Sequence, residues 1–321
     1  MSIFALIRAP RRAYSPEPHD LWSAALFFSF ALFSAVWPNT GRLRLGELAL
    51  PRGYAVAALL ALSGAVALWL GGREFGSSPR IIRFLRCFYP QAFFAPLFEE
   101  SILLSSQPWG GPPRDAFFAS ADLSIFGFQP AREFSGALGQ IPWCNEIMFG
   151  AYFSFYFMLV LTPWIPWLRG DEAEGERESS TLAGFMLVVY VFYVFFRVLG
   201  PKHYLPDLAS AGYGSLRGGF FTRLEGGILG SANTTGAAFP SSHVAVSLMM
   251  TSFVARTERR LLPLYALDAA LIALATVYVH AHWAVDVAGG AVAASLLVPL
   301  FSRLHARLGG AGAGSWAGGK P

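Results

Sequence analysis

The chain has 321 residues, of which 54% are hydrophobic and only 14% are charged. Soluble domains carry about 25% charged residues, and the mean hydropathy here is +0.46, so this composition excludes an ordinary soluble globular protein. The formal net charge is +4, but the arginines flank apolar runs, which indicates orientation in a membrane rather than binding to nucleic acid. We therefore expect an integral membrane protein with the lipid bilayer, and no nucleic acid, as its partner.

Apolar runs of about the length of a membrane span recur along the chain. The predicted fold is all-α, a polytopic helical bundle of about eight transmembrane helices. Their approximate bounds are residues 21–37, 54–70, 81–104, 144–168, 181–199, 241–255, 262–280 and 283–304. The third run contains Glu99 and Glu100, which we expect to pair with Arg197 or with backbone donors in a structural role.

The segments between and beyond these runs differ in character. Residues 1–79 comprise a retained leader and two spans, and residues 305–321 form a Gly-rich tail that we expect to be disordered. Residues 105–143 indicate an interfacial or re-entrant segment, and residues 200–239 an ordered functional loop. Most arginine-rich connections fall on one side if both termini are cytoplasmic, although the loop with Arg42, Arg44 and Arg52 disagrees.

The most informative residues are a histidine and an aspartate near the end of the chain. Asp286 follows His282 by one helical turn, so the two lie on the same face if the segment is helical. In phosphoryl transfer, His282 would be the nucleophile on phosphorus, and Asp286 would hold the imidazole in the required tautomer. The alternative is a His–Asp pair that only stabilises a helix terminus.

A second histidine stands in Phe239-Pro240-Ser241-Ser242-His243, at the start of another apolar run. The free backbone N–H groups of a helix start bind anions, so a phosphate near Ser241 and Ser242 would lie beside His243. His243 could then protonate the leaving oxygen. The alternative is an ordinary N-cap followed by a surface histidine. On the predicted topology, His243 and His282 both lie at the non-cytoplasmic face of the membrane.

Lys202 and Arg197 end the fifth run and are candidates to neutralise phosphate oxygens in the transition state. The alternative for both is interfacial snorkelling. A metal site built from His280, His282, His243 and Asp286 is a further alternative. On a helix, however, positions 280 and 282 point about 200° apart, so we expect no metal and no cofactor. We interpret His203 as a plain interfacial histidine.

These motifs resemble those of a known enzyme family. The segment 239–243 resembles the second motif, and His282 with Asp286 the third, of the type 2 phosphatidic acid phosphatase superfamily. The nearest branch is the inositol phosphorylceramide synthase-like, or inositolphosphotransferase, type. The resemblance to that branch extends to residues 276–278 with Gly289, to the segment 122–130 and to the stretch 200–204. The resemblance covers residues 80–304, which would be the catalytic membrane domain.

The resemblance implies a metal-independent lipid phosphatase or phosphotransferase that uses a phosphohistidine on His282, with His243 as acid and then base. Its substrate would be a phospholipid or lipid-linked phosphate, in what we expect is a bacterial inner membrane. The acceptor would be water or an alcohol such as inositol.

The sequence departs from the main phosphatase pattern, because Ala275-Thr276 replace the expected Ser-Arg and no clean first motif is present. Phosphate contacts would then come from Lys202 and from the Ser241 and Ser242 backbone. An alternative of another class is a transporter whose buried acids and histidines relay protons, but no internal repeat supports it.

Overall fold

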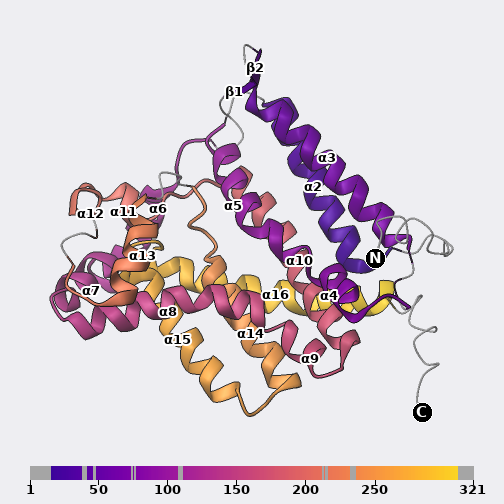
Figure 1. Ribbon diagram of the computed structural model, residues 1–321. Helices are drawn as coiled ribbons and strands as arrows, with labels where there is room; N and C mark the ends of the chain where they lie inside the picture. Colours follow the sequence, from indigo (N-terminus) through magenta and orange to yellow (C-terminus); the bar gives the residue numbers. More distant parts are fainter. Residues whose placement is uncertain are drawn as a thin grey trace. The chain divides into compact units, whose positions relative to one another are not determined.

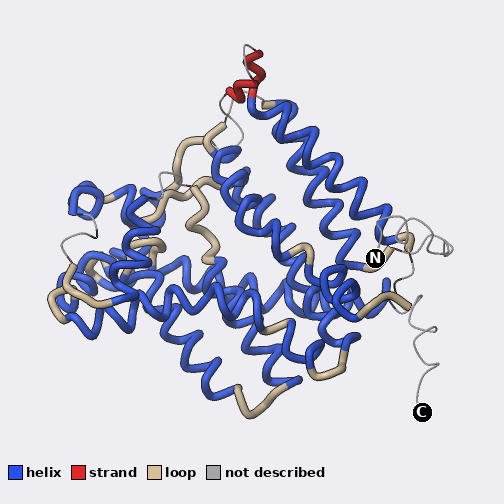
Figure 2. The backbone as a smooth tube through the Cα atoms, viewed as in Figure 1, coloured by secondary structure: helices blue, strands red, loops and turns tan. Residues whose placement is uncertain are grey.

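The computed structural model describes residues 16–37, 42–45, 48–73, 75, 77–107, 111–211, 213, 216–231 and 236–309. Helices dominate the described part, as the composition predicts, and its strands form one short hairpin (Figure 2). Most of the predicted leader and the tail beyond residue 309 lie outside the described residues.

Two compact units make up the chain. The first comprises Met1–Glu100, Pro166–Val191 and Val298–Pro321, and the second comprises Ser101–Ile165 and Phe192–Leu297. All the candidate site residues fall in the second unit, except Glu99 and Glu100.

In the first unit, α2 (Pro18–Val36) and α3 (Arg52–Gly71) lie side by side (Figure 1). They are joined through β1 (Arg42–Leu45) and β2 (Leu48–Pro51), an antiparallel pair that the apolar pattern did not predict. Glu100 accepts hydrogen bonds from Arg52 at 2.8 Å and from Ser34 Oγ at 3.0 Å. The expected pairing of Glu100 with Arg197 is therefore wrong, because Arg52 supplies the compensating charge.

The second unit is organised around α8 (Pro142–Leu161), which packs against α13 (Phe220–Ser231), α14 (Ser242–Thr257) and α15 (Leu262–Tyr278) (Figure 1). Short helices complete it: α6 (Asp115–Phe126), α7 (Pro130–Leu138), α11 (Pro201–Tyr204) and α12 (Pro206–Ala211). The predicted interfacial segment and functional loop are thus largely helical.

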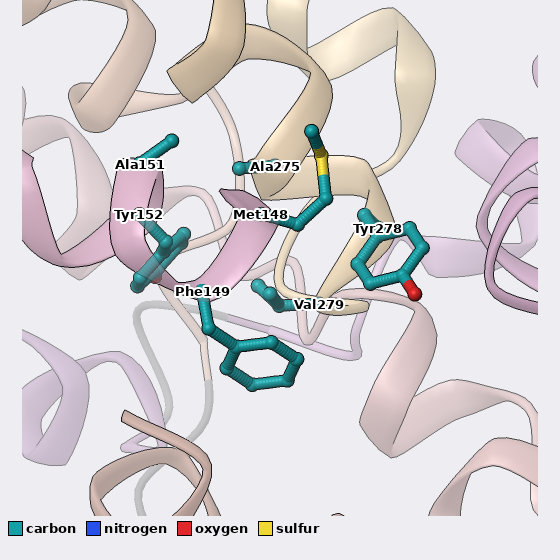
Figure 3. Packing of buried hydrophobic residues seen from close by; sticks show 7 residues of the cluster. All are labelled: Met148, Phe149, Ala151, Tyr152, Ala275, Tyr278 and Val279. Atoms are coloured by element: carbon teal, nitrogen blue, oxygen red, sulfur yellow. The ribbon is translucent and has the colours of Figure 1, made fainter. Parts of the chain in front are cut away.

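Buried side chains of α8 and α15 pack together in a hydrophobic cluster of the second unit (Figure 3). Met148, Phe149, Ala151 and Tyr152 come from α8, whereas Ala275 and Tyr278 come from α15 and Val279 follows it. The Tyr278 hydroxyl donates to Asn145 Oδ1, so the polar edge of this cluster is also satisfied. The cluster fixes the end of α15, from which the His282 motif continues.

Five helices of the described part are long and apolar enough to cross a membrane: α2, α3, α8, α10 (Glu172–Phe195) and α16 (Ala284–Gly309). α15 is apolar but shorter, so the number of about eight spans stays a prediction. The predicted third run is two helices, α4 (Arg80–Phe88) and α5 (Gln91–Ser105), and the fourth is α8 followed by α9 (Trp164–Leu168).

The predicted runs differ from the helices for local reasons. Pro90 and Pro163 fall at the two breaks, and a proline has no N–H to continue the preceding helix. α10 begins at Glu172 rather than near residue 181, since acidic residues suit the first turn of a helix. α16 continues to Gly309, past the predicted end at residue 304.

Candidate active site

The first histidine motif lies at the start of α14, as predicted. Ser241 is the N-cap, and its Oγ accepts a hydrogen bond from Val244 N at 3.4 Å. Helix α14 begins at Ser242, so His243 stands in the first turn. Ser241 and Ser242 are both buried. First-turn N–H groups have no partners within their own helix, and this end of α14 is therefore suited to an anion.

The second motif follows the end of α15, which is a Schellman motif. Ala281 N donates to Thr276 O at 3.1 Å, and His280 N donates to Val277 O at 3.1 Å. His280 takes the left-handed conformation with φ 61°. His282 N also donates to Thr276 O, at 3.1 Å. His282 is thus held by the end of α15 and lies just before α16, rather than on a continuous helix with Asp286 as the sequence suggested.

Two glycines of α16 allow the motifs to meet. A Cβ atom at Gly290 would lie 2.6 Å from Ser241 O, and one at Gly289 would lie 2.3 Å from the Phe239 ring. Because neither position has a side chain, Ser241 N can donate to Asp286 O at 3.3 Å. This close approach brings the start of α14 directly against the first turns of α16.

The two histidines belong to one site. The ring centroids of His243 and His282 are 5.7 Å apart, with the ring planes inclined at 66°. His282, Asp286 and the ring nitrogens of His243 are all buried. A site shielded from water in this way favours charge stabilisation by fixed groups over solvation by bulk water.

The orientation of the His282 ring defines its chemistry. Nδ1 lies 2.6 Å from Ala238 O, and a carbonyl oxygen only accepts, so Nδ1 carries the proton. The lone pair is then on Nε2, the nitrogen available to attack an electrophile. Asp286 Oδ2 is 3.6 Å from Nδ1 and accepts a hydrogen bond from Trp283 N at 2.8 Å. The tautomer is therefore set by the Ala238 carbonyl, and Asp286 contributes a nearby negative charge.

Aromatic packing holds the ring of His243. Its ring stacks on Tyr152 at 4.4 Å between centroids and packs against Phe155 at 4.2 Å. Neither ring nitrogen has a hydrogen-bond partner among the described residues. Buried polar groups in proteins are almost always partnered, so an unpartnered imidazole beside His282 is suited to exchange a proton with a ligand.

Two buried acids that sequence analysis missed position the second motif. Asp122, in α6, accepts from Ala284 N at 2.9 Å and from Val285 N at 3.0 Å, so it caps the start of α16. Burial raises the pKa of Asp122, and the two backbone donors oppose that rise. Asp122 opens the segment 122–130 that resembled the family's interfacial stretch, and this was its only sequence signal.

Asp115 ties the second motif to the stretch that contains Lys202. It accepts hydrogen bonds from Gly200 N at 2.9 Å and from Trp283 Nε1 at 3.0 Å. Gly200 has φ 88°, and a Cβ there would lie 2.5 Å from Ala281 O, so only glycine fits. No motif marks Asp115 in the sequence, because its partners are distant along the chain.

The two predicted phosphate-binding cations differ. Lys202 Nζ donates to Leu229 O and lies 4.9 Å from the centre of the Tyr213 ring. Burial lowers the pKa of Lys202. Arg197 Nε is buried without a hydrogen-bond partner among the described residues. Arg197 directly precedes Val198, whose backbone pairs with the segment 236–238 that binds His282.

The remaining histidines do not join this pair. His280 Nε2 lies 2.7 Å from Ser135 Oγ. The side chain of His203 is exposed. Within the ranges that the structure describes, no three His, Cys, Asp or Glu residues are grouped so that they could hold a metal ion. The absence of a metal stays a prediction.

Comparison with known proteins identifies the family. Residues 121–300, more than half of the 321-residue chain, match a family model described as the PAP2 superfamily. PAP2 stands for type 2 phosphatidic acid phosphatase, the superfamily that the motifs resemble. The match includes His243, His282 and Asp286, together with Arg197 and Lys202. Neither the curated proteins nor the solved structures gave a match. The family match, with both histidine motifs meeting in one buried site, shows that the chain belongs to the PAP2 superfamily.

Proposed function

We propose that the protein is a membrane-embedded lipid phosphatase or phosphotransferase that forms a phosphohistidine on Nε2 of His282. Membership of the PAP2 superfamily supports a membrane phosphatase-type function. The observation that carries the finer proposal is the 2.6 Å contact from His282 Nδ1 to Ala238 O. Because a carbonyl oxygen only accepts, Nδ1 carries the proton and the lone pair is on Nε2. The centroid of this ring lies 5.7 Å from the centroid of the His243 ring.

In the first step, His282 Nε2 attacks phosphorus and the bond from phosphorus to the leaving oxygen breaks. Protonated His243 donates a proton to that oxygen, which departs as an alcohol, and His243 is left neutral. The imidazolium that forms on His282 is stabilised by Asp286, whose carboxylate lies 3.6 Å from Nδ1. In the second step, His243 removes a proton from the acceptor, whose oxygen bonds to phosphorus as the N–P bond breaks.

The phosphate would be held by the first turn of α14, at Ser241 and Ser242, and by Arg197, with Lys202 at the edge of the site. Thr276 stands where the main phosphatase pattern has an arginine. Its Oγ1 donates to Ala273 O at 2.9 Å, and Thr276 is buried, so it supplies no cation. This loss was the sequence argument for the inositolphosphotransferase branch, in which an alcohol such as inositol replaces water as the acceptor.

The test uses the purified protein in detergent with EDTA and a panel of phospholipids, with and without inositol. Released phosphate and new lipids are followed by mass spectrometry. Phosphate release that requires His282 indicates a phosphatase, and a new phospho-alcohol lipid that appears only with the added acceptor indicates a transferase. His282→Ala should abolish both signals, whereas the exposed-histidine control His203→Ala should keep them. Activity that survives in His282→Ala would contradict the proposal.

A further inference from the structure

One buried carboxyl group in the same unit as the histidine pair has no part in the reaction described above. Glu225, in α13, is fully buried, and neither carboxylate oxygen has a hydrogen-bond partner among the described residues. Burial raises the pKa of Glu225 to about 7. Burying a carboxylate without a partner is costly, so this carboxyl group is suited to accept a hydrogen bond from a bound ligand.

The position of Glu225 is fixed by contacts between α13 and α8. Glu146, in α8, caps the start of α13 by accepting backbone hydrogen bonds, including one from Phe221 N at 3.1 Å. The Phe221 ring lies against Gly150 of α8, where an added Cβ would meet it at 3.2 Å. Glu225 follows Phe221 by one helical turn and therefore lies on the same side of α13. The packing of Phe221 on α8 therefore orients Glu225 toward α8.

Two tyrosines link this part of α13 to the histidine motifs. Gly226, the residue after Glu225, packs against Tyr213 and Phe149, where an added Cβ would meet their side chains at 3.3 Å and 3.7 Å. Tyr152 projects from α8 beside Phe149 (Figure 3), and His243 stacks on the Tyr152 ring. The Tyr213 hydroxyl donates to Val279 O at 2.6 Å, in the turn that leads to His282. These aromatic rings thus form a continuous packed path from the Glu225 region of α13 to His243 and to the turn before His282.

The surroundings select the chemistry of the missing partner. A second phosphate oxygen is unsuited, because it would place an anion next to a carboxyl group. A cationic group is disfavoured as well, since the Lys202 ammonium already lies 4.9 Å from the Tyr213 ring. Of these three partners, a hydroxyl group fits best, because it donates to a carboxylate and carries no charge. The carbon atoms that bear the hydroxyl can also pack on the aromatic rings.

We propose that Glu225, with the rings of Tyr152 and Tyr213, binds a hydroxyl-bearing group of the substrate or of the acceptor. This inference rests on the proposed function, because it assumes that phosphorus is bound at His282. A site built to hydrogen-bond a hydroxyl rejects the analogue that lacks it, since the analogue leaves the carboxyl group buried and unpartnered. Glu225 is therefore a specificity-determining residue rather than a second nucleophile.

The first experiment measures equilibrium binding to the full chain in detergent, in a His282→Ala background that prevents turnover. The probes are sn-glycerol 3-phosphate and n-propyl phosphate, which have the same phosphate and differ in two hydroxyl groups. We expect the glycerol ester to bind about tenfold more tightly, as one hydrogen bond to a charged group predicts. Glu225→Leu should remove this preference while keeping the affinity for n-propyl phosphate, which also shows that the variant is folded.

Two further variants serve as controls. Glu225→Gln keeps a hydrogen-bond acceptor and should retain part of the preference. Glu178→Gln changes another buried acid whose oxygens are unpartnered among the described residues, but one in the other unit, and should leave the preference intact. An unchanged preference in Glu225→Leu would overturn the inference, as would tighter binding of phosphoethanolamine than of the glycerol ester. If neither phosphate ester binds before Glu225 is changed, the proposed function itself has failed.

Turnover by otherwise unchanged protein separates the two sources of the hydroxyl group. If it belongs to the lipid headgroup, Glu225→Leu should lower kcat/KM about tenfold for phosphatidylglycerol but not for phosphatidylpropanol. If it belongs to a free acceptor, the same variant should raise the KM for added glycerol by a similar factor. Unchanged values in both assays would contradict the assignment.

Discussion

Two helices begin in the candidate site, and their first turns are treated differently. The start of α16 is occupied by the protein's own carboxylates, because Asp122 accepts from Ala284 N and Val285 N, and Asp286 accepts from Trp283 N. The start of α14 is met by neutral hydroxyl groups instead, because Val244 N donates to Ser241 Oγ and Ser242 hydrogen-bonds to Tyr193. Neither ring nitrogen of His243 beside it has a hydrogen-bond partner among the described residues. The start of α16 therefore already has anionic acceptors, whereas the start of α14 has neutral ones, which is why we propose α14 for the phosphate.

This contrast shows why similar motifs need not have similar roles. A helix start attracts anions through its free N–H groups and its dipole. When a buried aspartate already occupies those groups, a phosphate is repelled instead. We therefore propose the start of α14, where His243 stands, as the place that binds the phosphate.

Among changes at the two helix starts, His243→Asn at the start of α14 should reduce turnover the most. If His243 is the general acid, as proposed, this change should slow turnover of an ordinary phospholipid by about 10²–10⁴-fold. An ester with an acidic leaving group, such as p-nitrophenyl phosphate, needs no proton to depart, so its first step should be far less affected. Stopped-flow release of p-nitrophenol measures that step. Equal losses with both substrates would show that His243 is not the acid.

Gly290→Ala tests whether the two helix starts must touch. Its Cβ would meet Ser241 O at 2.6 Å, so α16 would move away from α14. A displacement of about 1 Å at a reacting centre costs about 10²-fold in rate. The matched control is Gly227→Ala, where an added Cβ meets nothing within 4 Å. Steady-state phosphate release compares the two, and equal activities would mean that the close approach is unnecessary.

Asp122→Asn should reduce activity the least of these variants. It tests whether the carboxylate at the start of α16 has a structural role. The amide keeps one oxygen for a backbone N–H but loses the charge, so the cap of α16 weakens by about 1 kcal/mol. Thermal unfolding in detergent should show the lower stability, with activity reduced only a few-fold. Asp207→Asn, at an exposed ion pair with Arg132, should change the stability less. A larger loss for Asp207→Asn would contradict this assignment of Asp122.

The sequence predicted those parts of the site that depend on local spacing. Ser241, His243, His282 and Asp286 stand in short motifs, and the structure brings these four residues together. Their chemical roles stay a prediction. The helical character also followed from composition, because apolar runs of this length satisfy their backbone groups only as helices in a membrane.

The rest could not be predicted because it depends on contacts between distant segments. Asp115 and Asp122 have backbone partners more than 80 residues away in the sequence, and an isolated acid in an apolar stretch does not reveal them. The acceptor for His282 Nδ1 is the carbonyl of Ala238, and every residue type carries such a group. Glu225 likewise gains its meaning only from the packing of α13 on α8.

The most direct test of the central claim is to locate the covalent phosphate. The His243→Asn variant is mixed with p-nitrophenyl phosphate, so that phosphorylation proceeds while hydrolysis is slow, and the reaction is quenched in base, in which phosphohistidine persists. Tandem mass spectrometry then maps the modified residue. We expect phosphate on His282 in this variant, and no phosphorylation in the double variant that carries both His243→Asn and His282→Ala. Phosphate on another residue, or turnover without any covalent intermediate, would contradict it.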